Sequence, residues 1–145
     1  MGRGPPRYCY DITTIAAVKR FQTEDRTGEK EGREQAGGRF YKECLCAELT
    51  AQNLETEAEV SIPLDYKGHR LASRLRVDLW IERAVIVEVK AVEGLRPIHE
   101  SQLITYLKLT HSPAGLLINF NEVLLKHGLK RLDRPDLYLK KKLSS

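Results

Sequence analysis

The chain has 145 residues, of which 41% are hydrophobic and 30% charged, a balance that suits one folded domain and excludes a wholly disordered chain. Lysine and arginine number 24 against 20 acidic residues, so the net charge of +4 permits a polyanionic partner without requiring one. We expect no membrane span, because the longest uncharged stretch (109–121) is short of the roughly 18 apolar residues that a span needs. We also expect a cytoplasmic location, because the three cysteines form an odd count and no apolar signal core follows the first arginines.

Residues 1–38 are predicted to form a poorly patterned or flexible N-terminal arm, with a short helix over 11–21. The segment 24–34 carries eight charged residues in eleven and is soon followed by Gly37-Gly38. Such a segment buries too little apolar area to offset the entropy lost on ordering. We therefore interpret it as a linker or a long exposed loop.

Residues 39–133 are predicted to form one α/β domain. Helical spacing of Phe40, Cys44 and Ala47, with Tyr41, Leu45 and Leu49 alongside, predicts a helix near 39–53. Alternating and β-branched segments predict strands over 57–65, 69–82, 84–90, 116–120 and 129–132, and a helix from Pro97 to about Thr110 separates the third strand from the fourth. This order predicts a mixed central sheet flanked by helices. Residues 134–145 are predicted to be a basic C-terminal tail.

Charged side chains fall within two predicted neighbouring strands. A period of two puts Leu75, Val77, Leu79 and Ile81 on one face of the strand 69–82, and Arg74, Arg76, Asp78 and Trp80 on the other. In the next strand Val85, Val87 and Val89 share a face, and Ile86, Glu88 and Lys90 share the opposite one. A valine-rich strand is predicted to be buried, where charges are costly unless they are matched. If the two polar faces coincide, Asp78, Glu88 and Lys90 converge.

These residue types suit metal-assisted phosphodiester chemistry. Asp78 and Glu88 could hold Mg²⁺ or Mn²⁺, with the carbonyl oxygen of Val89 as a further ligand. Lys90 could orient the attacking water or contact the scissile phosphate. Nucleic-acid contacts are predicted for Arg74, Arg76 and His99, and a helical stripe continues from His99 to Gln102 and Tyr106, which could hold the water, steady Lys90 or touch the nucleic acid.

The pattern of Asp78 followed by Glu88-Val89-Lys90 resembles the signature of the PD-(D/E)XK nuclease superfamily, which has the restriction-endonuclease-like fold. Gln102 and Tyr106 match the Gln-x-x-x-Tyr element of several of its branches, and residues 41–132 look like the small GxxExxY proteins. The resemblance implies a metal-dependent nuclease of DNA or RNA in which Asp78, Glu88 and Lys90 are metal and catalytic positions, and Gln102 and Tyr106 are accessories.

The sequence departs from the GxxExxY pattern in the element that gives those proteins their name. Only its tyrosine remains, as Tyr41, because Gly38 stands at the glutamate position and Gln35 at the first glycine position. Glu43 and Glu48 are candidate substitutes for the missing carboxylate.

Other readings stay open beside the nuclease. The same fold could be a catalytically lapsed module that binds nucleic acid or a protein through its arginine face, or a protein with no nucleic-acid role. The arginines and the basic tail could simply be solvated charges. Cys44-x-Cys46 suggests zinc, although two residues this close on a helix point apart, which favours small buried side chains. A domain this small has difficulty enclosing a duplex alone, which favours a homodimer.

Overall fold

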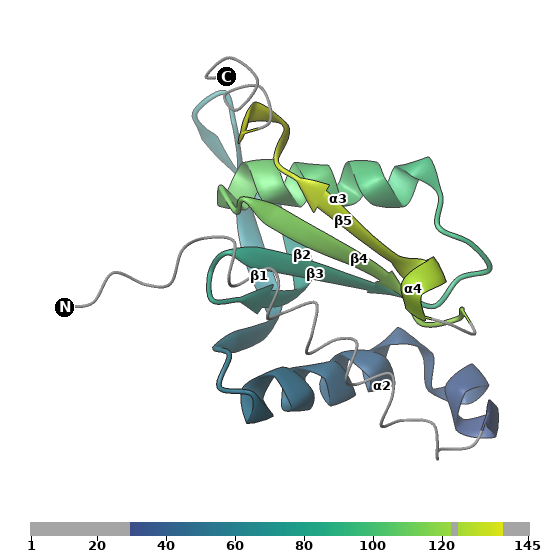
Figure 1. The fold of residues 1–145 in the computed structure, drawn as a ribbon. Coiled ribbons are helices and arrows are strands. Elements are labelled where there is room, and N and C mark those ends of the chain that lie inside the picture. Colours follow the sequence, from purple (N-terminus) through teal and green to yellow (C-terminus); the bar gives the residue numbers. More distant parts are fainter. Residues whose placement is uncertain (1–29, 123–124, 138–145) are drawn as a thin grey trace, which may run out of the picture.

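The computed structural model describes residues 30–122 and 125–137, which form a five-stranded sheet with helices on both faces (Figure 1). The sheet order is β1-β2-β3-β4-β5, with β3 and β4 parallel and the other pairs antiparallel. The predicted mixed α/β architecture is confirmed. The elements in chain order are α2 (Lys30–Ala51), β1 (Thr56–Tyr66), β2 (His69–Ile81), β3 (Val85–Lys90), α3 (Pro97–Thr110), β4 (Ala114–Asn119), α4 (Leu125–Gly128) and β5 (Leu129–Asp133).

Helix α3 is the crossover between the parallel strands β3 and β4, a connection that a tight turn cannot make. It begins with Pro97, whose missing N–H costs nothing in the first turn. The backbone N–H of Arg96 donates to His99 Nδ1 at 2.9 Å. The helix ends at Thr110 and is followed by its C-cap residue His111, which has a left-handed φ of 56°. These terminal features fix where α3 meets the sheet.

The sheet separates two apolar layers, because β3 and β4 are buried on both faces. On one side, Tyr41, Leu45 and Leu49 of α2 pack against the valines of β3. On the other side, the α3 residues Leu103, Tyr106 and Leu107 pack against Trp80, Ile86 and Leu117. Helices α2 and α3 therefore lie on opposite faces of β3, which carries the predicted site residues Glu88, Val89 and Lys90 (Figure 1).

The first helix differs from its prediction in two ways. It begins at Lys30 rather than near residue 39, so the predicted linker was wrong over its last part. Glu, Lys, Arg, Gln and Ala are strong helix formers, and this local preference outweighs the cost of Gly37-Gly38. The side facing the core is Tyr41, Leu45 and Leu49, whereas Ala47 is exposed. The predicted helix over 11–21 and the tail beyond residue 137 lie outside the described residues.

Strict alternation along β2 was also a wrong prediction at one position. Val77 packs on the α3 side together with Trp80, whereas Leu79 packs on the α2 side. The change of face occurs at Asp78, opposite Glu59 of β1, whose φ is +54°. The left-handed residue changes the face of β1 as well: Val60 packs on the α3 side, whereas Ala58 lines a cavity beside α2. Because Val60 pairs with Val77 and Ala58 pairs with Leu79, the two strands change face together. No helix in the described part of the chain is long and apolar enough to cross a membrane.

Candidate active site

The site lies where β2 and β3 separate. The two strands pair at three positions, the last of which is Leu79 with Val87. Beyond that pair, two carboxylates take the hydrogen bonds that the strand ladder no longer makes. The backbone N–H of Val89 donates to Asp78 Oδ2 at 2.8 Å, and the backbone N–H of Asp78 donates to Glu88 Oε1 at 3.2 Å. The predicted convergence of Asp78 and Glu88 is thus present, and it is built into the sheet.

Glu88 lies in an environment that disfavours its charge. Its side chain is only 4% exposed. Burial, followed by the nearby charge of Asp78, raises the pKa of Glu88 to about 8, although the hydrogen bond from the Asp78 backbone and the lysines Lys90 and Lys42 act in the opposite direction. A carboxyl group with a strongly raised pKa beside a second carboxylate is typical of a functional site.

Lys90 is held beside this pair by the α3 residues that the sequence singled out. Its Nζ lies 4.0 Å from Glu88 Oε2 and donates to Gln102 Oε1 at 3.2 Å. Gln102 Nε2 in turn donates to the Tyr106 hydroxyl at 2.8 Å. Burial, then the charge of Glu88, raises the pKa of Tyr106, so its hydroxyl keeps its proton. The two hydrogen bonds that link Lys90, Gln102 and Tyr106 hold the Lys90 amine beside the carboxyl groups of Asp78 and Glu88.

Lys42 of α2 is a site residue that the sequence interpretation missed. Its Nζ lies 3.3 Å from Asp78 Oδ1 and also pairs with Glu59 of β1. Burial works against the ammonium, but the hydrogen bond to Glu59 and the charge of Asp78 raise the pKa of Lys42 overall. The one sequence feature that could have indicated Lys42 is its place next to Tyr41, which begins the buried side of this helix.

Asn119, at the end of β4, is a second residue that was missed. It is fully buried, and its side chain accepts from the backbone N–H of Val92 at 3.0 Å and donates to the Val92 carbonyl at 2.8 Å. The backbone N–H of Phe120 donates to the Lys90 carbonyl at 2.9 Å. Together these bonds fix the chain that leaves β3 just after Lys90. A polar residue at the end of an apolar strand was the available signal.

The remaining predicted residues lie around this centre rather than in it. Arg74 donates to the Ser61 hydroxyl at 2.7 Å, and Arg76 lies 3.6 Å from Glu59. His99 contributes to the cap of α3. The candidate substitutes for the missing carboxylate pair within their own helix, Glu43 with Arg39 and Glu48 with Gln52, and Cys44 and Cys46 are half-buried cysteines of the same helix.

The side chains at this site suit a divalent cation that needs few protein ligands. Among the side chains that the structure describes, no group of three or more from His, Cys, Asp and Glu is placed to hold a metal. Asp78 and Glu88 supply two carboxylates, which suffices for Mg²⁺ because this ion is usually held by one or two carboxylates together with water and substrate phosphate oxygens. The residues therefore fit a magnesium-type site that is completed by its substrate.

Comparison with known proteins agrees with this geometry. The family model described as the PD-(D/E)XK nuclease superfamily matches residues 35–132, which include all the site residues above. A solved structure, entitled "Crystal structure of SSO0001", is similar with a TM-score of 0.51 and 23% identity over 74% of this chain, and the match spans 55% of that chain, which supports the restriction-endonuclease-like fold. The curated proteins give no match. The chain belongs to the PD-(D/E)XK nuclease superfamily.

Proposed function

We propose that the protein is a metal-dependent nuclease that hydrolyses phosphodiester bonds of DNA or RNA, with Asp78 and Glu88 holding Mg²⁺ or Mn²⁺. One observation carries the proposal: both carboxylates and the Lys90 amine meet in the gap between β2 and β3. A sheet that only needed stability would have no use for a buried carboxyl group whose pKa is raised to about 8.

The chemistry divides between the cation and the chain. When bound, the metal lowers the pKa of a coordinated water and neutralises charge that grows on the phosphorus centre. Lys90 supplies a positive charge that can orient the attacking water or contact the scissile phosphate. Gln102 holds the Lys90 amine through its carbonyl oxygen, and the Tyr106 hydroxyl fixes the amide of Gln102. The carbonyl oxygen of Val89 is proposed as a further metal ligand.

Substrate binding is assigned to Arg74 and Arg76, with His99 as a further proposed contact. Residues 65–74, in the end of the hairpin made by β1 and β2, are exposed throughout, so this hairpin can reach along a phosphate backbone. Arginine contacts to phosphates release counterions and weaken steeply with salt. Loss of either arginine should therefore weaken binding and reduce its salt dependence.

A catalytically lapsed module is the second candidate, and two features favour it. Lys42 neutralises Asp78 through a direct ion pair, and Gly38 replaces the glutamate of the GxxExxY element. Such a module would bind nucleic acid, or a protein partner, without cleaving it. Membership of the GxxExxY group, a homodimer and a cytoplasmic location stay predictions.

Cleavage assays separate the two candidates. Purified protein is incubated with single- and double-stranded DNA and RNA in Mg²⁺, Mn²⁺ or EDTA. We expect metal-dependent cleavage that disappears in Lys90→Ala and persists in Lys108→Ala, which removes an exposed lysine at the end of α3. Binding that ignores EDTA, with no cleavage by any preparation, would instead identify the lapsed module.

A further inference from the structure

Lys42 places a positive charge at the carboxylate that the proposed function assigns to the metal. Its Nζ is 3.3 Å from Asp78 Oδ1, on the oxygen that the Val89 N–H leaves free. The two side chains are 19% and 17% exposed, so water screens this ion pair only in part. One carboxylate oxygen of Asp78 therefore accepts a hydrogen bond from the backbone of β3, and the other pairs with the Lys42 amine of α2.

The position of Lys42 is set by Glu59 as well. Glu59 has a left-handed backbone, at the point where β1 lies opposite Asp78, and its carboxylate pairs with Lys42. A non-glycine residue in this conformation is held there by its surroundings, and such residues concentrate at functional sites. The backbone of β1 thus brings a second anion to the lysine that already contacts Asp78.

We propose that Lys42 is an intrinsic competitor of the divalent cation: its ammonium occupies Asp78 and must move away before the metal can bind. This inference rests on the proposed function, because it assumes that Asp78 is a metal ligand. Two cations cannot share one carboxylate oxygen closely without strong repulsion. The lysine therefore lowers the affinity for metal and keeps the acidic pair partly neutralised when no metal is bound.

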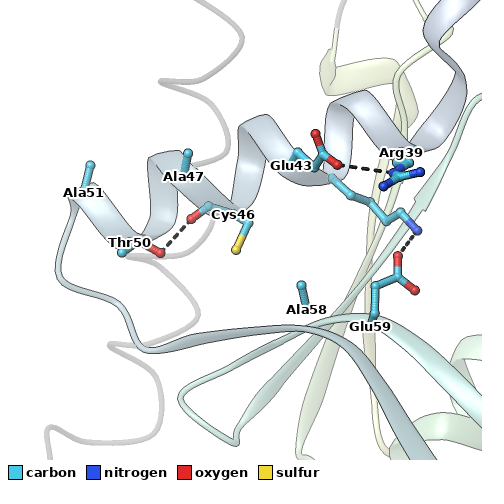
Figure 2. A pocket seen from close by; sticks show the side chains of 9 residues that line it. Arg39, Glu43, Cys46, Ala47, Thr50, Ala51, Ala58 and Glu59 are labelled. Carbon is cyan, nitrogen blue, oxygen red and sulfur yellow. Dashed lines mark hydrogen bonds and ion pairs between the residues drawn. The ribbon is translucent and has the colours of Figure 1, made fainter.

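A cavity beside the site gives Lys42 a place to move. It has a volume of about 790 Å³ and lies between α2 and β1, with Lys42 and Glu59 in its wall. Figure 2 shows Glu59 pointing from β1 toward the α2 residues Arg39 and Glu43, and Ala58 next to it. Lys42 can therefore turn away from Asp78 and keep its ion pair with Glu59. Release of the ammonium does not leave a buried charge without a partner.

The expected size of the effect follows from the charge pair. Removal of a unit positive charge that lies beside a partly screened carboxylate changes the binding constant of another cation at that carboxylate by a factor on the order of ten. We expect Lys42→Met, which keeps an unbranched side chain of similar length and removes its charge, to bind Mn²⁺ about tenfold more tightly than the wild-type chain.

The test is a calorimetric titration of Mn²⁺ alone into the full chain after chelator treatment, without nucleic acid. Lys42→Arg keeps the charge and should stay within about twofold of the wild type. Arg39→Gln is the matched control, because it removes one positive charge a turn away on the same helix, where Arg39 pairs with Glu43 at the surface. It should also change the affinity by less than about twofold. Lys42→Gln repeats the charge removal with a polar side chain if Lys42→Met does not fold.

The outcomes separate this inference from the proposed function. Tighter Mn²⁺ binding in Lys42→Met or Lys42→Gln, lost again when Asp78→Asn is added, supports the competition. Equal or weaker binding in the lysine variants, with a wild-type affinity that depends on Asp78, overturns the competition and leaves the metal site intact. Absence of Mn²⁺ binding in the wild type and in every lysine variant overturns the competition alone, because the proposed metal site is completed by its substrate, and the cleavage assay above then decides the proposed function.

Discussion

Glu88→Gln is expected to stabilise the metal-free protein at neutral and alkaline pH, although it should abolish cleavage. Glutamine keeps an oxygen that can accept from the Asp78 backbone N–H, and it has no charge to bury. The wild-type carboxyl group is buried beside Asp78, and its pKa is raised to about 8. Removal of the titrating group should therefore relieve an electrostatic cost rather than create one.

The magnitude follows from the difference in proton binding between the folded and unfolded states. A carboxyl group with a folded pKa of about 8 and an ordinary value of 4.5 holds its proton more tightly when folded. Its contribution to stability is therefore complete below pH 4.5 and is lost as the pH rises toward 8. At about 1.4 kcal/mol per pKa unit, the wild-type chain would lose at most about 4–5 kcal/mol over this range, a large part of the stability of a domain this size.

Urea denaturation between pH 4.5 and 9, with EDTA present, measures this loss. The advantage of Glu88→Gln should be near zero at pH 4.5, grow with pH by up to about 1.4 kcal/mol per unit, and level off above pH 8. Glu93→Gln, which removes an exposed carboxylate just after β3, is the matched control and should show no such growth. A difference between Glu88→Gln and wild type that stays constant with pH would refute the assignment of a raised pKa to Glu88.

Three further substitutions test the packing and the site. Gly128→Ala should lower the free energy of unfolding, measured by urea denaturation, by more than about 2 kcal/mol, because the added Cβ would lie 2.4 Å from a backbone carbonyl oxygen at the end of β4. Gly94→Ala is the control and should be neutral, because the space around Gly94 is open. Equal effects of the two substitutions would contradict the close packing at Gly128. Ser112→Ala should cost about 1–3 kcal/mol, since it leaves the buried Trp80 indole N–H without its 3.0 Å acceptor, and an unchanged melting curve would argue against this bond. Gln102→Leu should lower the single-turnover cleavage rate about 10- to 100-fold and leave the melting temperature near that of the wild type, because Lys90 loses the hydrogen bond to Gln102. Full activity of this variant would exclude a role of Gln102 in positioning Lys90.

Most of the sheet could be predicted because its signals are local. β3 and β4 are short apolar strands rich in branched residues, and Pro97 marks the start of the intervening helix. The start of α2 was misjudged for a related reason. The high charge density of this segment favours disorder, but the helix preference of the same residues decides the structure.

The centre of the site could be predicted in part. Asp78, Glu88 and Lys90 were identified because charges in buried strands need a purpose, and the structure brings them together. Lys42 and Glu59 were missed, because their contact depends on how α2 crosses β1 and on a left-handed backbone. Glutamate is not a residue that signals such a conformation, so no local pattern predicts the change of face opposite Asp78.

The separation of β2 and β3 has a consequence for how this protein can change over evolutionary time. Each acidic residue of the pair also closes a main-chain hydrogen bond that the diverging strands have given up. If hydrolysis were lost, substitutions at both positions would therefore remain constrained. Asn can replace Asp78 and Gln can replace Glu88, but Ala or Val would leave a backbone N–H without an acceptor. Descendants that no longer cut nucleic acid should keep a side-chain oxygen at each of these two places.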